Sequence, residues 1–168
     1  AEWNDTRVPR SRGILLDDLF AAQAACTPDA SAAAFEGETL TYAELDARTD
    51  RLARHLRKLG CGPESRVGVA LERTLDLLVA FLGVLKAGAV YVPLDPQYPR
   101  ERQAFLLQSS RLAALLSQET LLDRLPVPAG LPVVDLEGAL EMLLDHPHIA
   151  SKRWVYEQYD STVQASTV

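Results

Sequence analysis

The chain has 168 residues, the length of one ordinary domain or of part of a larger one. Apolar residues make up 48% and charged residues 24%, as in soluble globular proteins, and the net charge of -6 argues against non-specific binding to nucleic acid or anionic lipid. No apolar run approaches the roughly 20 residues that cross a bilayer, and the polar N-terminus lacks the apolar core of a signal peptide. We therefore expect a cytoplasmic protein with neither nucleic acid nor membrane as a partner.

The first third of the chain predicts a helix, a hairpin and a longer helix. Apolar residues recur at helical spacing from Ile14 to Cys26, until Thr27-Pro28-Asp29 breaks the pattern. Short runs over residues 32–35 and 39–41 flank a glycine-containing turn, which is typical of a β-hairpin. Thr41 and Glu44 have the spacing of a capping box, and a helix over residues 42–59 should follow.

Strands and helices should alternate through the middle of the chain. Thr74 can cap a helix over residues 75–86, which is apolar on nearly every side and should be well buried. The other predicted elements are strands over 67–71, 89–92, 112–116 and 131–134 and a helix over 100–109. This alternation predicts an α/β fold, a layered and mainly parallel sheet with flanking helices. The residues expected to be mostly buried are Leu52, Leu56, Val69, Leu77, Val79, Phe81, Val84, Tyr91 and Val92.

The residues that could carry chemistry have simpler structural explanations. Lys86 could hold a phosphate, but at the C-terminal end of a helix it complements the helix dipole. Asp17 and Asp18 could be paired acid/base carboxylates, but at a helix start they favour its positive end. Three histidines, His55, His146 and His148, lack metal-ligand spacing, and two cysteines, Cys26 and Cys61, are expected to be reduced thiols.

Two segments resemble core motifs of the adenylation domains of non-ribosomal peptide synthetases. Residues 40–45 (Leu-Thr-Tyr-Ala-Glu-Leu) resemble the first motif, and residues 85–95 (Leu-Lys-Ala-Gly-Ala-Val-Tyr-Val-Pro-Leu-Asp) resemble the second. They occur in the family's order, and the resemblance covers about residues 2–135. Trp3-Asn4-Asp5-Thr6 resembles the linker that precedes such domains, so condensation and carrier domains of a multi-domain synthetase are the partners implied.

The resemblance implies the large N-terminal subdomain of an adenylate-forming ligase of secondary metabolism, such as antibiotic biosynthesis. That family uses ATP and Mg to convert an amino acid into an aminoacyl adenylate. It binds ATP with a later Ser/Thr/Gly-rich loop ending in Pro-Lys-Gly, and with acidic, arginine and lysine motifs beyond that loop, none of which occurs in these 168 residues. We therefore expect no catalytic, cofactor-binding or metal-binding residue in this chain, and little or no activity from it alone.

The end of the chain has a different character. Residues 139–168, and above all the run from Ile149 to Asp160, resemble phosphoribosylformylglycinamidine synthase, a purine-pathway amidotransferase, although Ser161 and Ala165 depart from its pattern. The sequence thus suggests a linker over 1–13, a partial adenylation subdomain over 14–135 and a tail of other origin over 136–168. Because a cut α/β domain leaves apolar surface exposed, we expect the tail to cover it, with Trp154 buried against the chain or in a homo-oligomer.

Two alternative functions remain open on the sequence alone. The chain could be a non-catalytic interaction or scaffold module that binds a partner through its aromatic tail. It could also be a fragment of the purine-biosynthesis amidotransferase, if residues 136–168 rather than residues 14–135 determine its function.

Overall fold

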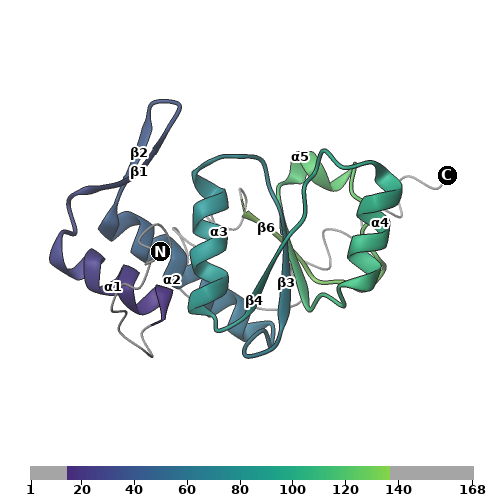
Figure 1. Cartoon of the computed structure of the whole chain (residues 1–168), viewed down its shortest axis with the longest axis horizontal. Coiled ribbons are helices and arrows are strands. Elements are labelled where there is room, and N and C mark those ends of the chain that lie inside the picture. The colour runs from purple at the N-terminus through teal and green to yellow at the C-terminus, as the bar shows by residue number, and fades with distance from the viewer. Residues whose placement is uncertain (1–14, 137–168) are drawn as a thin grey trace, which may run out of the picture.

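The computed structural model describes residues 15–136, in which strands and helices alternate along most of the length (Figure 1). The helices are α1 (Leu16–Cys26), α2 (Tyr42–Lys58), α3 (Leu75–Lys86), α4 (Arg100–Ser109) and α5 (Glu119–Leu122). The strands are β1 (Ser31–Phe35), β2 (Glu38–Thr41), β3 (Arg66–Ala70), β4 (Val90–Pro93), β5 (Ala114–Ser117) and β6 (Val133–Asp135).

Four of the strands form a parallel sheet in the order β4-β3-β5-β6. Val67 of β3 pairs with Tyr91 on one side and with Ala114 on the other, and Leu116 of β5 pairs with Val134. Parallel neighbours require crossover connections, and α3 and α4 lie in those that lead from β3 to β4 and from β4 to β5. The predicted α/β class, with a parallel sheet and flanking helices, is confirmed.

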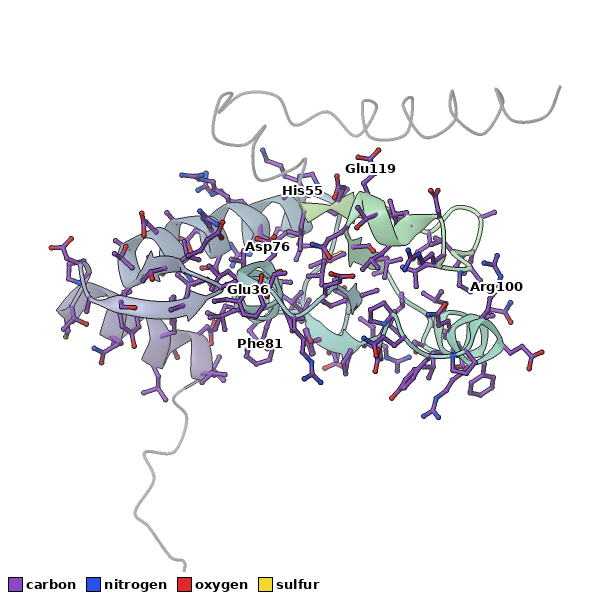
Figure 2. The ribbon with its side chains drawn as sticks, turned by 90° about the horizontal axis from the view of Figure 1, so that it is seen from above. Glu36, His55, Asp76, Phe81, Arg100 and Glu119 are labelled. Atoms are coloured by element: carbon purple, nitrogen blue, oxygen red, sulfur yellow. The ribbon has the colours of Figure 1, made fainter. Side chains whose placement is uncertain are left out.

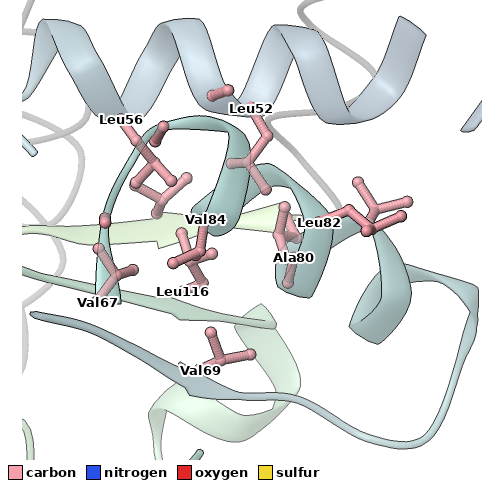
Figure 3. Packing of buried hydrophobic residues seen from close by; sticks show 14 of the residues in the cluster. Leu52, Leu56, Val67, Val69, Ala80, Leu82, Val84 and Leu116 are labelled. Carbon is pink, nitrogen blue, oxygen red and sulfur yellow. The ribbon is translucent and has the colours of Figure 1, made fainter. Parts of the chain in front are cut away.

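Side chains of the parallel strands alternate between two apolar cores, one on each face of the sheet. Val67 and Val69 point into the larger core, which α2 and α3 cover (Figure 3). Ala70 and Leu115 belong to the smaller core, which includes Leu107 of α4. We call these faces the deep face and the thin face.

Helices α2 and α3 pack closely on the deep face. Leu52 and Leu56 of α2 are at most 2% exposed, and Val84 of α3 is fully buried (Figure 3). A Cβ placed on Gly83 would lie 2.6 Å from Cδ2 of Leu52 and 3.0 Å from its Cβ. The glycine therefore permits an approach that any larger residue would prevent.

The capping box predicted for α2 is present. The Glu44 backbone N–H donates to Oγ1 of Thr41 at 3.2 Å, and the Thr41 N–H donates to Oε2 of Glu44 at 2.8 Å. The helix ends before Gly60, whose φ of +84° is a conformation that favours glycine. Local sequence thus fixes both ends of this helix.

Strands β1 and β2 form an antiparallel hairpin that projects from the body of the molecule (Figure 1). Its turn places Glu36 and Gly37 at φ of +48° and +91°, positive values at both central positions as a type I′ hairpin turn requires. Leu40 is only 4% exposed and anchors the hairpin to the larger core.

Several predicted details differ from the structure. Helix α5 was not predicted, because four residues are too few to show a helical period. Strand β5 begins at Ala114 rather than at residue 112, since Arg111 has a φ of +50° that interrupts extended backbone. Leu52, Leu56, Val69, Val79 and Val84 are buried as expected, whereas Leu77, Phe81, Tyr91 and Val92 are only partly buried.

Phe81 and Tyr91 make an edge-to-face pair at the margin of the deep face. Their ring centroids are 5.1 Å apart and the planes cross at 85°, a favourable aromatic geometry. Figure 2 shows Phe81 on the opposite side of the molecule from Glu119. The predictions for the linker over 1–13, for the tail over 136–168 and for Trp154 fall on residues that lie, apart from Leu136, outside the described part.

Candidate functional site

Open parallel sheets usually bind ligands at the carboxyl ends of their strands, where the strand order reverses. In the order β4-β3-β5-β6, the connection after β3 leads to β4 at one edge of the sheet. The connection after β5 leads to β6 at the opposite edge. Since β3 and β5 are neighbours, the reversal lies between their carboxyl ends. We therefore take this edge, formed by residues 71–76 and 117–119, as the candidate site.

Two hydrogen bonds join the loops at this edge. The Ser117 hydroxyl donates to the Ala70 carbonyl at 3.0 Å, and the Glu72 backbone N–H donates to Oε1 of Gln118 at 3.2 Å. Ser117 and Gln118 are 0% and 5% exposed. Both side chains therefore make structural contacts that hold the ends of β3 and β5 together.

The start of α3 adds a threonine and an aspartate to this edge. Thr74 occupies the N-cap position, but its side chain does not cap the helix, which corrects the sequence prediction. Its Oγ1 is buried and makes no hydrogen bond within residues 15–136. The Leu77 N–H, one of the N–H groups in the first turn of α3, donates instead to the Thr74 backbone carbonyl at 3.2 Å.

Burial raises the pKa of the Asp76 carboxyl above its ordinary value. The carboxylates of Glu38 and Asp135 raise this pKa further, and the Arg48 guanidinium opposes them by lowering it. Figure 2 labels Asp76 in the middle of the molecule. Residues 71–76 and 117–119 thus carry three carboxylates, Glu72, Asp76 and Glu119, against one guanidinium, Arg73, at a helix N-terminus, where a nucleotide site needs free backbone N–H groups and positive charge.

The residues present at this edge do not fit ATP with its magnesium. A phosphate-binding loop uses successive backbone N–H groups of a glycine-rich turn together with a lysine. Residues 71–76 contain neither glycine nor lysine, and their one arginine, Arg73, is outnumbered by the carboxylates of Glu72, Asp76 and Glu119, which would repel a phosphate. No step of adenylation is therefore assigned to these side chains.

Lys86, the most tempting candidate in the sequence, has a structural role. It lies in the last turn of α3, as predicted, and its Nζ is 2.5 Å from Oδ1 of Asp46 and 2.7 Å from Oδ1 of Asp50. The same Nζ lies 5.3 Å from the ring centroid of Phe20, and the Lys86 carbonyl accepts a hydrogen bond from Arg57. Its side chain, 10% exposed, thus joins α1, α2 and α3.

Sequence reasoning did not find the partners of Lys86. Asp46 and Asp50 are four residues apart and therefore share one face of α2, which was the available clue. Nothing in the sequence placed that face against the end of α3. We call Lys86, Asp46 and Asp50 the lysine cluster.

The remaining candidates stay apart from one another. Burial lowers the pKa of His55, with a smaller contribution from the nearby Lys58 charge. Burial raises the pKa of the Cys61 thiol, whereas Cys26 is exposed, and both cysteines are free. Within residues 15–136, no group of three or more His, Cys, Asp or Glu side chains is placed to hold a metal ion. Asp17 and Asp18 lie in the first turn of α1, as predicted.

Among the described residues, no helix is both long enough and apolar enough to cross a membrane.

Comparison with known proteins connects this scaffold to one family. A family model described as AMP-binding enzyme matches residues 20–165. One of the proteins that make up the linear gramicidin synthase of Brevibacillus parabrevis is 49% identical over 125 residues, which are 74% of this chain and 2% of that protein. The chain therefore spans only a small part of the length of this curated relative.

Solved structures agree with the sequence comparison. FmoA3, a nonribosomal peptide synthetase in a form bound to alpha-methyl-L-serine-AMP, is 40% identical with a TM-score of 0.76, covering 83% of this chain and 16% of that one. The N-terminal subdomain of Klebsiella oxytoca NpsA is 25% identical with a TM-score of 0.67, covering 75% of this chain and 32% of that one. Both likenesses extend over most of residues 15–136.

Proposed function

Because the chain belongs to the family of AMP-binding enzymes, we propose that it forms the opening part of the N-terminal subdomain of an amino-acid-activating adenylation domain. The parent would be a nonribosomal peptide synthetase of antibiotic biosynthesis, located in the cytoplasm, with condensation and carrier domains as partners. The observation that carries this proposal is the 49% identity to a gramicidin synthase over 125 residues, combined with a fold that matches FmoA3.

Within that domain, we propose that this chain supplies scaffold and no catalytic group. Lys86 is bound to two carboxylates, and Ser117 and Gln118 hold neighbouring strands together. The edge where a ligand would be expected carries three carboxylates, Glu72, Asp76 and Glu119, and one arginine, Arg73. Binding of ATP, magnesium and the amino acid is thus assigned to other parts of the parent.

A segment exchange tests whether this chain supplies scaffold only, with ligand binding in other parts of the parent. Residues 15–136 would replace the corresponding segment in an adenylation domain of the linear gramicidin synthase, and ATP–pyrophosphate exchange would be measured with each proteinogenic amino acid. We expect the amino-acid preference of the recipient to be unchanged. A new preference would show that this chain helps to select the substrate, and the scaffold assignment would then be wrong.

The chain alone should give no exchange above a control without enzyme. If exchange is seen, and if Lys86→Met abolishes it while the circular dichroism spectrum and Tm are unchanged, then a residue of this chain performs chemistry. A Lys58→Met variant, which alters an exposed lysine outside the cluster, is the matched control.

The tail supports a second candidate. The run from Ile149 to Asp160 resembles the purine-pathway amidotransferase, and on that ground residues 136–168 could be a tail of other origin joined to the adenylation scaffold. The AMP-binding family match overlaps most of this segment, since it reaches residue 165. Sequencing the parent gene past Val168 separates the two: continuation into a Ser/Thr/Gly-rich loop favours the adenylation domain, and continuation into amidotransferase sequence favours the fusion.

The alternative of a non-catalytic interaction module predicts a stable complex. Size-exclusion chromatography with light scattering on the whole chain would show a homo-oligomer if the tail drives self-association. A monomer at all concentrations would leave the scaffold proposal as the simpler account.

A further inference from the structure

Helices α1 and α2 lie side by side at one end of the described molecule (Figure 1). Between them is an open hollow of about 480 Å³. Alanines of both helices line it, among them Ala21 and Ala25 of α1 and Ala43 and Ala47 of α2. Larger side chains at these positions would fill the space, so the small residues keep it open. We call this hollow the alanine groove.

Basic side chains continue the same face of α2 beyond the alanines. Residues three and four apart are neighbours on a helix, so Ala43, Ala47, Arg51, Arg54 and Lys58 follow one another along one face. Arg51 and Arg54 also line the hollow, and the side chains of Arg54 and Lys58 are exposed. We call Arg51, Arg54 and Lys58 the basic stripe.

Carboxylates of the described chain do not neutralise the basic stripe. Both salt bridges within residues 15–136 belong to Lys86, which holds two aspartates of α2. Asp50 lies four residues before Arg54, at the spacing of a helical ion pair, but its Oδ1 is 2.7 Å from Nζ of Lys86 instead. Burial lowers the pKa of His55, and the Lys58 charge lowers it further, as expected where positive charge is not cancelled.

We propose that the alanine groove and the basic stripe together form a docking surface for an acidic amphipathic helix of a partner protein. Eleven residues separate Ala43 from Arg54, which corresponds to about 17 Å, or three turns of a partner helix. Small side chains let a third helix approach α1 and α2 closely, as helix-in-groove recognition requires. Apolar side chains of the partner lie on the alanines, and its carboxylates lie opposite the basic stripe.

A nucleic acid is a weaker candidate for this surface. The basic stripe extends over only about 10 Å of helix, whereas a DNA-binding protein commonly makes about 6–10 phosphate contacts. The net charge of -6 would also repel a polyanion beyond the stripe. A contact of three helical turns buries less than the roughly 800 Å² per partner of a stable interface, so we expect a transient complex. This inference does not rest on the proposed function.

A synthetic helix provides the probe. The full chain would be titrated into a fluorescein-labelled peptide of five Glu-Ala-Ala-Leu repeats, which carries a glutamate stripe beside a leucine stripe, and fluorescence anisotropy would report binding. We expect saturable binding that weakens as salt screens the charges. Arg51→Glu combined with Arg54→Glu should weaken binding about tenfold, since two attractions become repulsions. Arg73→Glu combined with Arg102→Glu has the same net charge, alters two exposed arginines elsewhere, and should leave binding unchanged.

A further variant tests the alanine groove separately from the charge. Ala47→Phe fills the hollow, so it should weaken binding about tenfold while the salt dependence stays the same. Gln108→Phe adds the same ring at an exposed position of α4 and is the control. Circular dichroism and Tm check that each variant is folded. If Arg51→Glu with Arg54→Glu is not folded, Arg51→Gln with Arg54→Gln replaces it, with an expected loss of about threefold.

Each other result overturns the proposal. Absence of binding to the acidic peptide, or equal losses in the two arginine-to-glutamate double variants, would show that α2 offers no specific surface. Full binding by Ala47→Phe would show that the alanine groove is not used. If a DNA duplex binds more tightly than the peptide, and Arg51→Glu with Arg54→Glu abolishes this, the stripe is a nucleic-acid site. If light scattering shows a dimer that the same double variant dissociates, a second copy of the chain is the occupant.

Discussion

The deep face and the thin face of the parallel sheet are built from the same strands but are packed very differently. On the deep face, α3 is apolar on almost every side. It alone buries Val79, Ala80, Leu82 and Val84. On the thin face, α4 buries only Gln103 and Leu107, while Phe105 is 68% exposed. The comparison indicates that stability within residues 15–136 comes mainly from the deep face, and that the thin face tolerates change.

The largest difference between the faces should come from deleting a leucine. Leu56→Ala removes a side chain that is 0% exposed among α2, α3 and the sheet, and it should lower the free energy of unfolding by about 3–5 kcal/mol. Leu107→Ala, on the thin face, should cost about 2 kcal/mol, since fewer neighbours lose contacts. Urea unfolding followed by circular dichroism measures both, and equal losses would contradict the distinction.

A smaller difference is expected from adding one methyl group. In Gly83→Ala the new Cβ meets Cβ and Cγ of Leu52, atoms close to the backbone that cannot move aside. Overpacking costs about 1–3 kcal/mol, and the higher helix propensity of alanine returns about 1 kcal/mol, so a net loss remains. In Gly68→Ala the Cβ meets the terminal methyl groups of Leu112, Leu94 and Leu115, which can rotate.

Gly68→Ala should therefore change the free energy of unfolding by less than about 0.5 kcal/mol, because the methyl contacts relax and the strand loses less entropy than with glycine. Thermal unfolding of the two variants side by side provides the measurement. If Gly68→Ala lowers the stability more than Gly83→Ala does, the thin face is the more rigid of the two faces.

The last difference concerns the helix caps. Thr41 and Glu44 cap α2 on the deep face, whereas α4 has no side-chain cap. Thr41→Ala should lower the free energy of unfolding at neutral pH by about 1 kcal/mol. Thr39→Ala, on the exposed strand next to the cap, is the control and should have little effect.

The same cap should respond to acid. Hydrogen bonds from the Thr41 backbone and side chain lower the pKa of Glu44 below its ordinary value. A lowered pKa stabilises the fold above the pKa of the unfolded carboxyl, and this stabilisation is lost as the pH falls through the folded pKa. Thr41→Ala removes the hydroxyl donor but keeps the backbone N–H, so it should weaken that acid dependence only in part, whereas Glu44→Gln should remove it. A Glu44→Gln pH profile identical to that of the unaltered chain would show that the box contributes nothing in solution.

Sequence alone predicted what local patterns encode. The capping box at Thr41 and Glu44, the turn at Gly37 and the apolar run of α3 each fix an element without help from distant residues. The helix over Arg100–Ser109 was predicted with its observed bounds, since Pro99 sets its start. Motif resemblance then gave the family, which the comparisons confirm.

Contacts between distant segments were beyond such reasoning. The place of β3 between β4 and β5 depends on which crossover packs on which face. The partners of Lys86 lie 36 and 40 residues away, and the close approach at Gly83 depends on how α2 crosses α3. Thr74 was expected to cap α3, but its hydroxyl makes no hydrogen bond among residues 15–136, although its backbone is extended as in an N-cap residue.

The lysine cluster also makes one residue a reporter of local opening. An amine-directed reagent reaches Lys58 freely, since that side chain is exposed. It reaches Lys86 only when the contacts with Asp46 and Asp50 break, because the lysine side chain is 10% exposed and held by both carboxylates. The ratio of the two labelling rates therefore measures how often the end of α3 separates from α2, a motion that a melting curve of the whole chain does not resolve.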